Sequence, residues 1–291
     1  MKANQDRAVI VSPFHKEGDW LLGLFDGHGS LGHCVAELAS QKLPKLLLER
    51  ISASTTSAEI SSILFQTFVD LHVQSIVPVA MLKEAGTTAI SMLKLGNTLY
   101  ISNLGDSVAF VVKYDETNIQ TSLTVVYQTK PHKPDDPLER RRIEAAGGHV
   151  LNAPFRGVSS RLLIPLADGM EVGLAMSRSL GDAEGDRVGH SAEPTTDILP
   201  LQTLINTANN PNIKCLCLCA SDGLLDKVSP LQVAHHVATS FLPHDPLLPL
   251  EAAEQLLLRA SNGWLYELMG GGYRDDMTIA VHKLELELEL S

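Results

Sequence analysis

The sequence predicts an α+β fold or a layered sandwich rather than a doubly wound α/β sheet. Short apolar segments bounded by Asp and Gly indicate strands, and longer segments with apolar residues three and four positions apart indicate helices. The two kinds of segment do not strictly alternate along the chain, which disfavours a doubly wound topology. The 291 residues are 44% apolar and 20% charged and contain no Pro-, Gly- and Ser-rich linker, so we expect one domain over residues 1–291.

Four predicted strands run into or out of aspartate. Three of them end beside a glycine and an aspartate: WLLGLF before Asp26, NTLYISNL before Asp106 and IKCLCLCA before Asp222. The fourth, MTIAVHKL, follows Asp275. This repeated pattern suggests that the four strand ends share one sheet edge. The tail LELELELS alternates strictly, which fits either a longer last strand or a frayed end, and we assign it no function.

Five segments between the strands have helical periodicity, at residues 33–50, 58–77, 137–146, 229–241 and 250–264. Thr56 or Ser57 is the candidate N-cap of the second segment, and Ser229 is the candidate N-cap of the fourth. Pro137 near the start of the third and Gly147-Gly148 after it are typical of helix boundaries. We therefore expect helices on the outside of a sheet core.

The segment from residue 149 to about residue 196 differs from the rest of the chain. It contains six glycines and has weak periodicity. A stretch of this length without regular structure is uncommon in a compact domain, and such stretches are usually lids or binding loops.

Charge and hydropathy exclude several kinds of partner. The formal net charge of −11 argues against a nucleic-acid-binding protein, which would carry a basic surface. The first residues, MKANQDRAVI, lack the apolar core of a signal peptide, and no apolar run is long enough to span a bilayer. We expect no membrane partner and a cytoplasmic or nuclear location.

The four cysteines are Cys34, Cys215, Cys217 and Cys219. The last three alternate with other residues, so on a strand they share one face. A zinc site requires paired cysteines near turn residues, and this run has neither the paired spacing nor the turn residues. We therefore expect buried free thiols in a reducing compartment.

The aspartates at the strand ends indicate a cation site. A single Asp-Gly after a strand is usually a turn, but Asp26, Asp106, Asp222 and Asp275 repeat the pattern. Carboxylates gathered in one place repel one another unless a cation binds between them. All-oxygen ligands favour Mg²⁺ or Mn²⁺ over zinc or copper. Two such ions would activate a water against a phosphate ester.

His28 follows Asp26 by two residues. It is either a surface loop histidine or a general acid, because the pKa of histidine lies near neutral pH. Its place beside Asp26 favours the general acid, which would protonate a departing serine or threonine oxygen.

Seven motifs in order resemble those of the type 2C (PPM) metal-dependent serine/threonine protein phosphatases, over nearly the whole chain. They are Asn4-Gln5-Asp6, Phe25-Asp26-Gly27-His28-Gly29, Gly86-Thr87-Thr88-Ala89, Asn103-Leu104-Gly105-Asp106-Ser107, Ser177-Arg178-Ser179-Leu180-Gly181-Asp182, Ala220-Ser221-Asp222-Gly223 and Asp275-Asp276-Met277-Thr278. The resemblance implies a four-layer α-β-β-α sandwich, with two central antiparallel sheets flanked by helices. It also places residues 149–196 at the family's variable flap, which is thought to influence substrate choice.

The resemblance further implies hydrolysis of phosphoserine and phosphothreonine in proteins, by a water that bridges two Mg²⁺ or Mn²⁺ ions and without a phosphoenzyme. Asp26 would bridge both metals, and Gly27 would offer its carbonyl to one of them. Asp222 and Asp275 would complete the other, and Asp106 resembles the ligand of a weaker third metal. The expected partners are phosphoprotein substrates, and we expect a monomer.

The N-terminus departs from the family pattern. Many members have a glutamate at the position of Gln5, so metal affinity is expected to fall there, with Asp6 compensating in part. The family's phosphate-binding arginine would fall at Met1, so Lys2 or Arg7 would have to bind phosphate instead. Members usually have a further strand upstream, so we expect a truncated N-terminal strand.

A second departure leaves another function class open. Pro131 precedes His132-Lys133-Pro134 where members often have an aspartate, and we assign that segment no role. With Gln5 and without the upstream arginine, the chain would also fit a pseudophosphatase-type binding module with impaired metal loading. The retained aspartates and His28 favour the enzyme.

Overall fold

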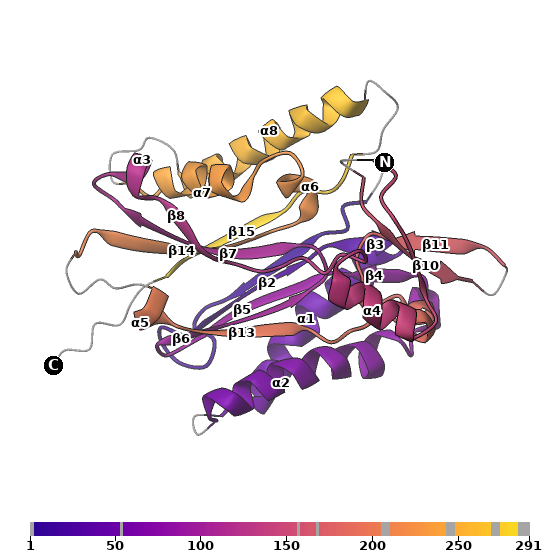
Figure 1. Ribbon diagram of the computed structural model, residues 1–291. Coiled ribbons are helices and arrows are strands. Elements are labelled where there is room, and N and C mark those ends of the chain that lie inside the picture. The colour runs from indigo at the N-terminus through magenta and orange to yellow at the C-terminus, as the bar shows by residue number, and fades with distance from the viewer. Residues whose placement is uncertain are drawn as a thin grey trace.

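The computed structural model describes residues 3–52, 55–155, 158–166, 169–204, 210–242, 248–268 and 274–284 (Figure 1). Two antiparallel sheets form its centre. The first has the strand order β1-β2-β5-β6-β13, with β1 (Arg7–Val11), β2 (Trp20–Phe25), β5 (Ala89–Leu95), β6 (Thr98–Leu104) and β13 (Thr195–Pro200). The second has the order β15-β14-β7-β8, with β15 (Ile279–Leu284), β14 (Ile213–Ala220), β7 (Val108–Asp115) and β8 (Thr124–Gln128).

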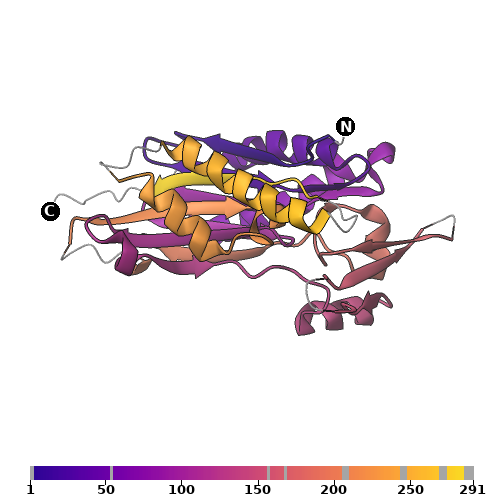
Figure 2. The same ribbon diagram turned by 90° about the horizontal axis from the view of Figure 1, so that it is seen from above.

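Helices cover both outer faces of the sheet pair (Figures 1 and 2). On the first sheet lie α1 (Gly32–Arg50) and α2 (Ser57–Asp70), which continues into the π-helical η1 (Leu71–Ile76). On the second lie α7 (Pro230–Thr239) and α8 (Pro249–Leu268). The predicted α-β-β-α sandwich is therefore confirmed. The short helices are η2 (Ala80–Leu82), α3 (Ile119–Ser122), α5 (Leu201–Leu204) and α6 (Asp222–Leu225). In the described residues no helix is both long and apolar enough to cross a membrane.

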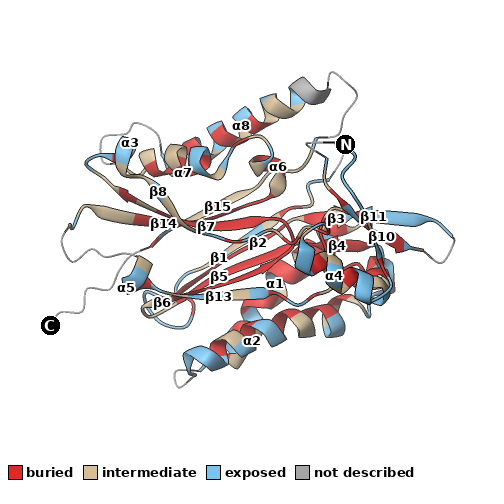
Figure 3. Ribbon diagram, in the orientation of Figure 1, coloured by how far each residue is buried: buried red, intermediate tan, exposed pale blue. Residues whose placement is uncertain are grey.

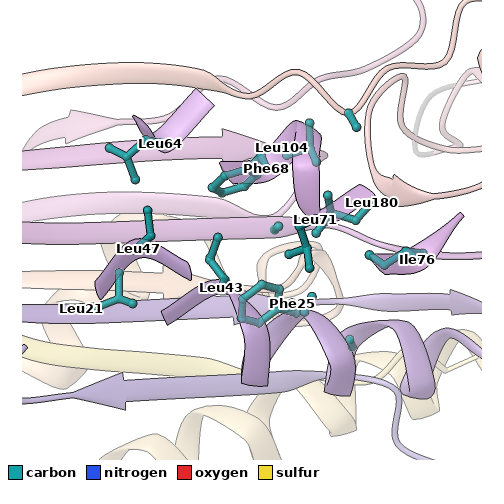
Figure 4. Close-up of a cluster of buried hydrophobic side chains, with 14 of the residues drawn as sticks. Leu21, Phe25, Leu43, Leu47, Leu64, Phe68, Leu71, Ile76, Leu104 and Leu180 are labelled. Atoms are coloured by element: carbon teal, nitrogen blue, oxygen red, sulfur yellow. The ribbon is translucent and has the colours of Figure 1, made fainter. Parts of the chain in front are cut away.

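Three apolar cores hold the four layers together, and Figure 3 shows the buried strands between them. The core between the first sheet and its helices includes Leu21, Phe25, Leu43, Leu64 and Phe68 (Figure 4). Alternate residues of β2, such as Leu22, face the core between the two sheets. Because both faces of β2 are buried, its sequence is a continuous apolar run.

Local signals fix several element ends as predicted. Thr56 caps α2 in a capping box in which its backbone N–H donates to Glu59 Oε2 at 2.7 Å. Ser229 caps α7 in the same way, with Gln232. Helix α4 (Pro137–Ala145) begins at its proline.

The three cysteines of β14 are buried free thiols in the core between the sheets, as predicted. Cys34 is free and exposed on α1.

The prediction of one shared sheet edge is wrong. Asp26 follows β2 of the first sheet, whereas Asp222 follows β14 and Asp275 precedes β15 in the second. Asp106 lies where the chain crosses from β6 in the first sheet to β7 in the second. The aspartates therefore meet at one end of the sandwich, because strand ends of two packed sheets come within about 10 Å of each other.

The segment 149–196 carries a small sheet of its own. Its strands β9 (His149–Leu151), β10 (Arg161–Pro165) and β11 (Glu171–Leu174) have the order β11-β10-β9, and the β10-β11 hairpin extends beyond the end of the sandwich (Figure 2). A separate core, which includes Leu162 and Ile164, supports this sheet. We refer to residues 149–194 as the flap. The flap also contains β12 (Leu180–Gly181) and η3 (Ala183–Val188), and it ends where β13 begins.

A second small sheet, in the order β12-β4-β3, joins the flap to the sandwich through β4 (Ala85–Thr87) and β3 (Gly27–Gly29). The tail, residues 285–291, for which a longer last strand was one prediction, lies outside the described residues.

Candidate active site

A cleft of about 840 Å³ opens where the strand ends of the two sheets meet the flap. Asp26, Gly27, His28, Asp222 and Asp275 line it. Residues of the flap strands β10 and β11 also line it, among them Arg161, Ile164, Val172 and Gly173. The structure thus brings five of the predicted site residues to one cavity.

Asp26 is fixed by the turn after β2. Its backbone N–H donates to Thr88 Oγ1 at 3.1 Å, and its carbonyl accepts from the Thr88 N–H at 2.9 Å. Burial raises the pKa of the Asp26 carboxyl well above its usual range, and the neighbouring carboxylates of Asp6 and Asp222 raise it further. A metal-free site therefore disfavours the ionised form of Asp26.

Asp222 stands at the start of α6, directly after β14. Burial raises its pKa to about 8, and the charges of Asp106 and Asp275 contribute to the shift. Lys133 opposes the shift but does not cancel it. The carboxylates thus repel one another across the cleft, which is the electrostatic setting that a divalent cation reverses.

Lys133 neutralises Asp106, a contact that the sequence analysis did not predict. Its Nζ lies 2.5 Å from Asp106 Oδ2, and the Asp106 side chain is fully buried. His132 positions this loop, since its Nδ1 accepts from the Gly105 N–H at 3.1 Å and its Nε2 lies 2.9 Å from Thr195 Oγ1. No local sequence signal links Lys133 to Asp106, because 27 residues separate them.

Gln5 lines the cleft, whereas the neighbouring Asp6 is buried and does not line it. The Nε2 of Gln5 donates to the Gly29 carbonyl at 2.8 Å. The Oδ2 of Asp6 accepts from Ser221 Oγ at 2.9 Å. Burial raises the pKa of Asp6, and its Oδ1 is buried with no hydrogen-bond partner. The amide oxygen of Gln5 has no donor among the described residues, so it is available to a cation.

Gly27 is required by close backbone packing. A Cβ at this position would lie 2.6 Å from the backbone of both Gln5 and Gly32. No larger residue fits without displacing the turn, and the tight turn brings the Gly27 backbone to the cleft.

His28 is paired with Asp182, a residue to which the sequence analysis gave no role. Its Nε2 lies 2.7 Å from Asp182 Oδ2. Burial lowers the pKa of His28, but the Asp182 carboxylate outweighs burial and raises it above its ordinary value. Asp182 ends the fifth of the seven motifs, and its place in a motif is the only sequence signal that points to it. Its partner lies 154 residues away.

Buried polar groups support Asp182 in turn. Ser179 Oγ donates to Asp182 Oδ2 and lies 2.7 Å from His190 Nε2. His190 Nδ1 lies 3.0 Å from Asp186 Oδ1, and Asp186 Oδ2 lies 3.1 Å from Nε2 of His72 in the π-helical turn. Such a network fixes the orientation of the carboxylate that holds His28.

Of the two predicted phosphate-binding residues, the structure describes only Arg7. Arg7 is not among the residues that line the cleft: its Nε lies 2.5 Å from Glu37 Oε2, and its Nη1 donates to the Asp6 carbonyl at 2.8 Å. Lys2 lies outside the described residues.

The donor set fits Mg²⁺ or Mn²⁺, since all of its members offer oxygen. As the side chains of the described residues stand, no three acidic, histidine or cysteine groups converge on one point. The raised pKa values of Asp26 and Asp222 and the unpartnered Oδ1 of the buried Asp6 are the features that a cation would relieve.

Comparisons with known proteins give one family. The family model for protein phosphatase 2C matches residues 5–262. The chain is 28% identical to a probable protein phosphatase 2C of Arabidopsis thaliana over 90% of its length and 75% of the relative's. It is 33% identical to a rice relative, probable protein phosphatase 2C 48, over 62% of its length, which is 56% of that relative.

Solved structures agree on the fold. A serine-threonine phosphatase 2C from Toxoplasma gondii superposes with a TM-score of 0.72 at 18% identity, covering 97% of this chain and 90% of that one. A C. elegans sex determining protein gives a TM-score of 0.71 at 23% identity, covering 98% of this chain and 62% of that one. The chain therefore belongs to the protein phosphatase 2C family, and its enzyme class is that of a protein serine/threonine phosphatase.

Proposed function

We propose that the cleft hydrolyses phosphoserine and phosphothreonine in proteins with two Mg²⁺ or Mn²⁺ ions and without a phosphoenzyme. The observation that carries the proposal is the group of carboxylates around Asp26, whose pKa is raised by burial and by the charge of Asp6 and Asp222. A site that holds so much negative charge binds a phosphate dianion only when cations reverse its sign.

Asp26 would hold both ions, with Gly27 and the amide oxygen of Gln5 on one side and Asp222 and Asp275 on the other. When bound, the ions would supply an activated water and neutralise the phosphoryl oxygens. Asp106 would serve a weaker third ion in competition with Lys133, whose ammonium now neutralises it.

His28 would donate a proton to the serine or threonine oxygen as it departs. Because Asp182 raises the pKa of His28, the imidazole keeps its proton closer to neutral pH than an isolated histidine. The hydrogen bond to Asp182 also limits the rotation of the ring. The family likeness and this pairing both support the role of general acid.

Chelation is expected to abolish turnover. Without a cation the carboxylates repel the substrate, so hydrolysis of an aryl phosphate and of a phosphothreonine peptide should both vanish with EDTA and return with millimolar Mn²⁺ or Mg²⁺. The measurement is the initial rate across a metal titration. Turnover that persists after exhaustive chelation would refute the metal-dependent proposal. Phosphopeptide binding with no turnover at any metal concentration would instead favour a pseudophosphatase-type binding module.

Replacing Gln5 with glutamate is expected to lower the metal concentration that gives half-maximal activity. The substitution adds a negative charge at a residue that lines the cleft, and a carboxylate attracts a divalent cation more strongly than an amide does. Gln202→Glu, on the short helix α5, makes the same charge change away from the cleft and should leave the midpoint unchanged. An unchanged midpoint in Gln5→Glu would mean that this position lies outside the metal shell.

A further inference from the structure

The cleft contains few positive charges to meet an anionic substrate. Besides the aspartates of the proposed metal site, Glu84, Glu184 and Asp226 line it. Among the described residues that line it, the only lysine and arginine are Lys83 and Arg161. A phosphoryl group carries close to two negative charges at neutral pH. Its binding is therefore expected to depend strongly on whichever of these two cations reaches it.

Arg161 begins strand β10 of the flap, and its stem is held along the neighbouring strand. A Cβ added to Gly173 would lie 3.2 Å from Arg161 Cβ, 3.4 Å from Cγ and 3.6 Å from Cδ. The stem therefore lies against the bare backbone of Gly173, where any side chain would crowd it. Gly173 lines the same cleft as Arg161. The glycine thus orients the arginine at the cleft wall.

The guanidinium of Arg161 is largely uncommitted. Its one hydrogen bond within the described structure is a long one, from Nη1 to the Gly173 carbonyl at 3.5 Å. Among the described residues, Arg161 forms no ion pair with a carboxylate. By contrast, Arg7 pairs with Glu37, and both Arg142 and Arg178 pair with Glu139. Most of the five N–H donors of Arg161 are therefore available to a ligand.

Lys83 is the weaker candidate. Like Arg161 it is exposed, but it is next in sequence to Glu84, and none of the described glycines packs against its stem as Gly173 packs against that of Arg161. An ammonium is a point charge, whereas a guanidinium binds two oxygens of a phosphate at once.

We propose that Arg161 binds the phosphoryl group of the substrate, in the place of the N-terminal cation that the described part of the chain does not bring to the cleft. The proposal rests on the proposed phosphatase function, and it assigns the flap a direct role in holding the phosphate.

The test is a comparison of kcat and KM at saturating Mn²⁺ for Arg161→Ala, Arg161→Lys and Lys83→Ala, with an aryl phosphate and a phosphothreonine peptide. Arg161→Ala is expected to raise KM about tenfold or more for both substrates, because a hydrogen bond to a charged group contributes about 1.5–3 kcal/mol. Its kcat should stay within about twofold of wild type, since uniform binding affects KM. Arg161→Lys should recover part of the loss.

Gly173→Val provides a second route to the same effect. Its branched side chain would displace the Arg161 stem, so KM is expected to rise as in Arg161→Ala. The double variant should then show no further increase, because both changes remove one interaction. Additive increases would mean that Gly173 does not act through Arg161. Thermal melting of each variant checks that the fold is kept.

Three outcomes would overturn the proposal: unchanged KM in Arg161→Ala, a rise for the peptide alone, or an equal rise in Lys83→Ala. A rise in KM for the peptide alone would mean that Arg161 contacts the peptide and not the phosphoryl group. An equal rise in KM for Lys83→Ala would mean that KM depends on the net charge of the cleft and not on Arg161 in particular. Wild-type turnover reports separately on the proposed function. If wild type does not turn over, calorimetric titration of Mn²⁺-loaded wild type and Arg161→Ala with inorganic phosphate still tests the assignment, with weaker binding expected for the variant.

Discussion

Asp222→Asn is expected to abolish turnover and, at neutral pH, to raise the melting temperature of the metal-free protein. Asparagine keeps the shape of the side chain and removes the charge that a divalent cation requires. In the absence of metal, the same change removes the cost that burial and the carboxylates of Asp106 and Asp275 impose on Asp222, which at neutral pH must take up a proton because its pKa is raised to about 8. A residue that served only the scaffold would lose stability on substitution, so the two effects together identify a ligand.

The pH dependence gives this prediction a second readout. The pKa of Asp222 is about 8 in the folded metal-free protein and 3.8 for an unperturbed aspartate. Between these values the folded state binds a proton that the unfolded state has lost, so the contribution of Asp222 to stability falls as pH rises. The asparagine of Asp222→Asn does not titrate, so the stability of this variant should fall less as pH rises. Its stabilisation relative to wild type should be largest at and above about pH 8.

The measurements are kcat at saturating Mn²⁺ and thermal melting in EDTA from pH 5 to pH 9. Glu116→Gln is a suitable control, because its pairing with Lys214, at 3.4 Å, is partly exposed and is expected to contribute little. Near-wild-type kcat in Asp222→Asn at saturating metal would exclude Asp222 as a ligand. A melting temperature that falls in EDTA would exclude the argument from burial and repulsion.

His28→Ala is expected to slow hydrolysis of phosphothreonine peptides by about 10²–10⁴-fold, which is the usual contribution of a general acid. The loss should be smaller for aryl phosphates, since a phenolate departs with little help from a proton. Metal affinity should not change, because the imidazole is bonded to Asp182 and is not proposed to bind a cation. The readouts are kcat on both substrates and the metal midpoint.

The comparison between substrates makes the prediction specific. A variant that merely disturbed the cleft would slow both substrates equally, and that result would argue against proton donation. His235→Ala controls for the loss of a histidine and should leave both rates unchanged, because His235 is a half-buried residue of α7 that does not line the cleft. A shifted metal midpoint would place His28 near the ions rather than at the leaving group.

Most of the architecture could be predicted because its signals are local. The caps at Thr56 and Ser229 and the proline that begins α4 depend on neighbours three residues away or fewer. The buried thiols follow from the two-residue period of β14. These features are determined within one element, so periodicity and capping chemistry are sufficient to find them.

The errors and omissions concern contacts between distant parts of the chain. Periodicity indicates that a segment is a strand but not which sheet it joins. The sequence pattern alone therefore favours one shared edge, whereas the aspartates come from two sheets. The pairs His28–Asp182 and Asp106–Lys133 depend on how loops fold over the sandwich end. The flap strands lacked a clear pattern because several of their residues, such as Leu151 and Val172, are exposed.

The origin of the carboxylates in two different sheets has a mechanical consequence. A cation shared by Asp26 and Asp222 would lie across the boundary between the layers, so a small shear of one sheet over the other would change the coordination sphere. The residues that resist this shear are the interlocked side chains between the sheets, among them Leu22, Met92 and Cys217. The fit of that inner layer would therefore set the spacing of the proposed ligands, and the affinity for the cation would depend on packing in the middle of the protein as well as on the cleft.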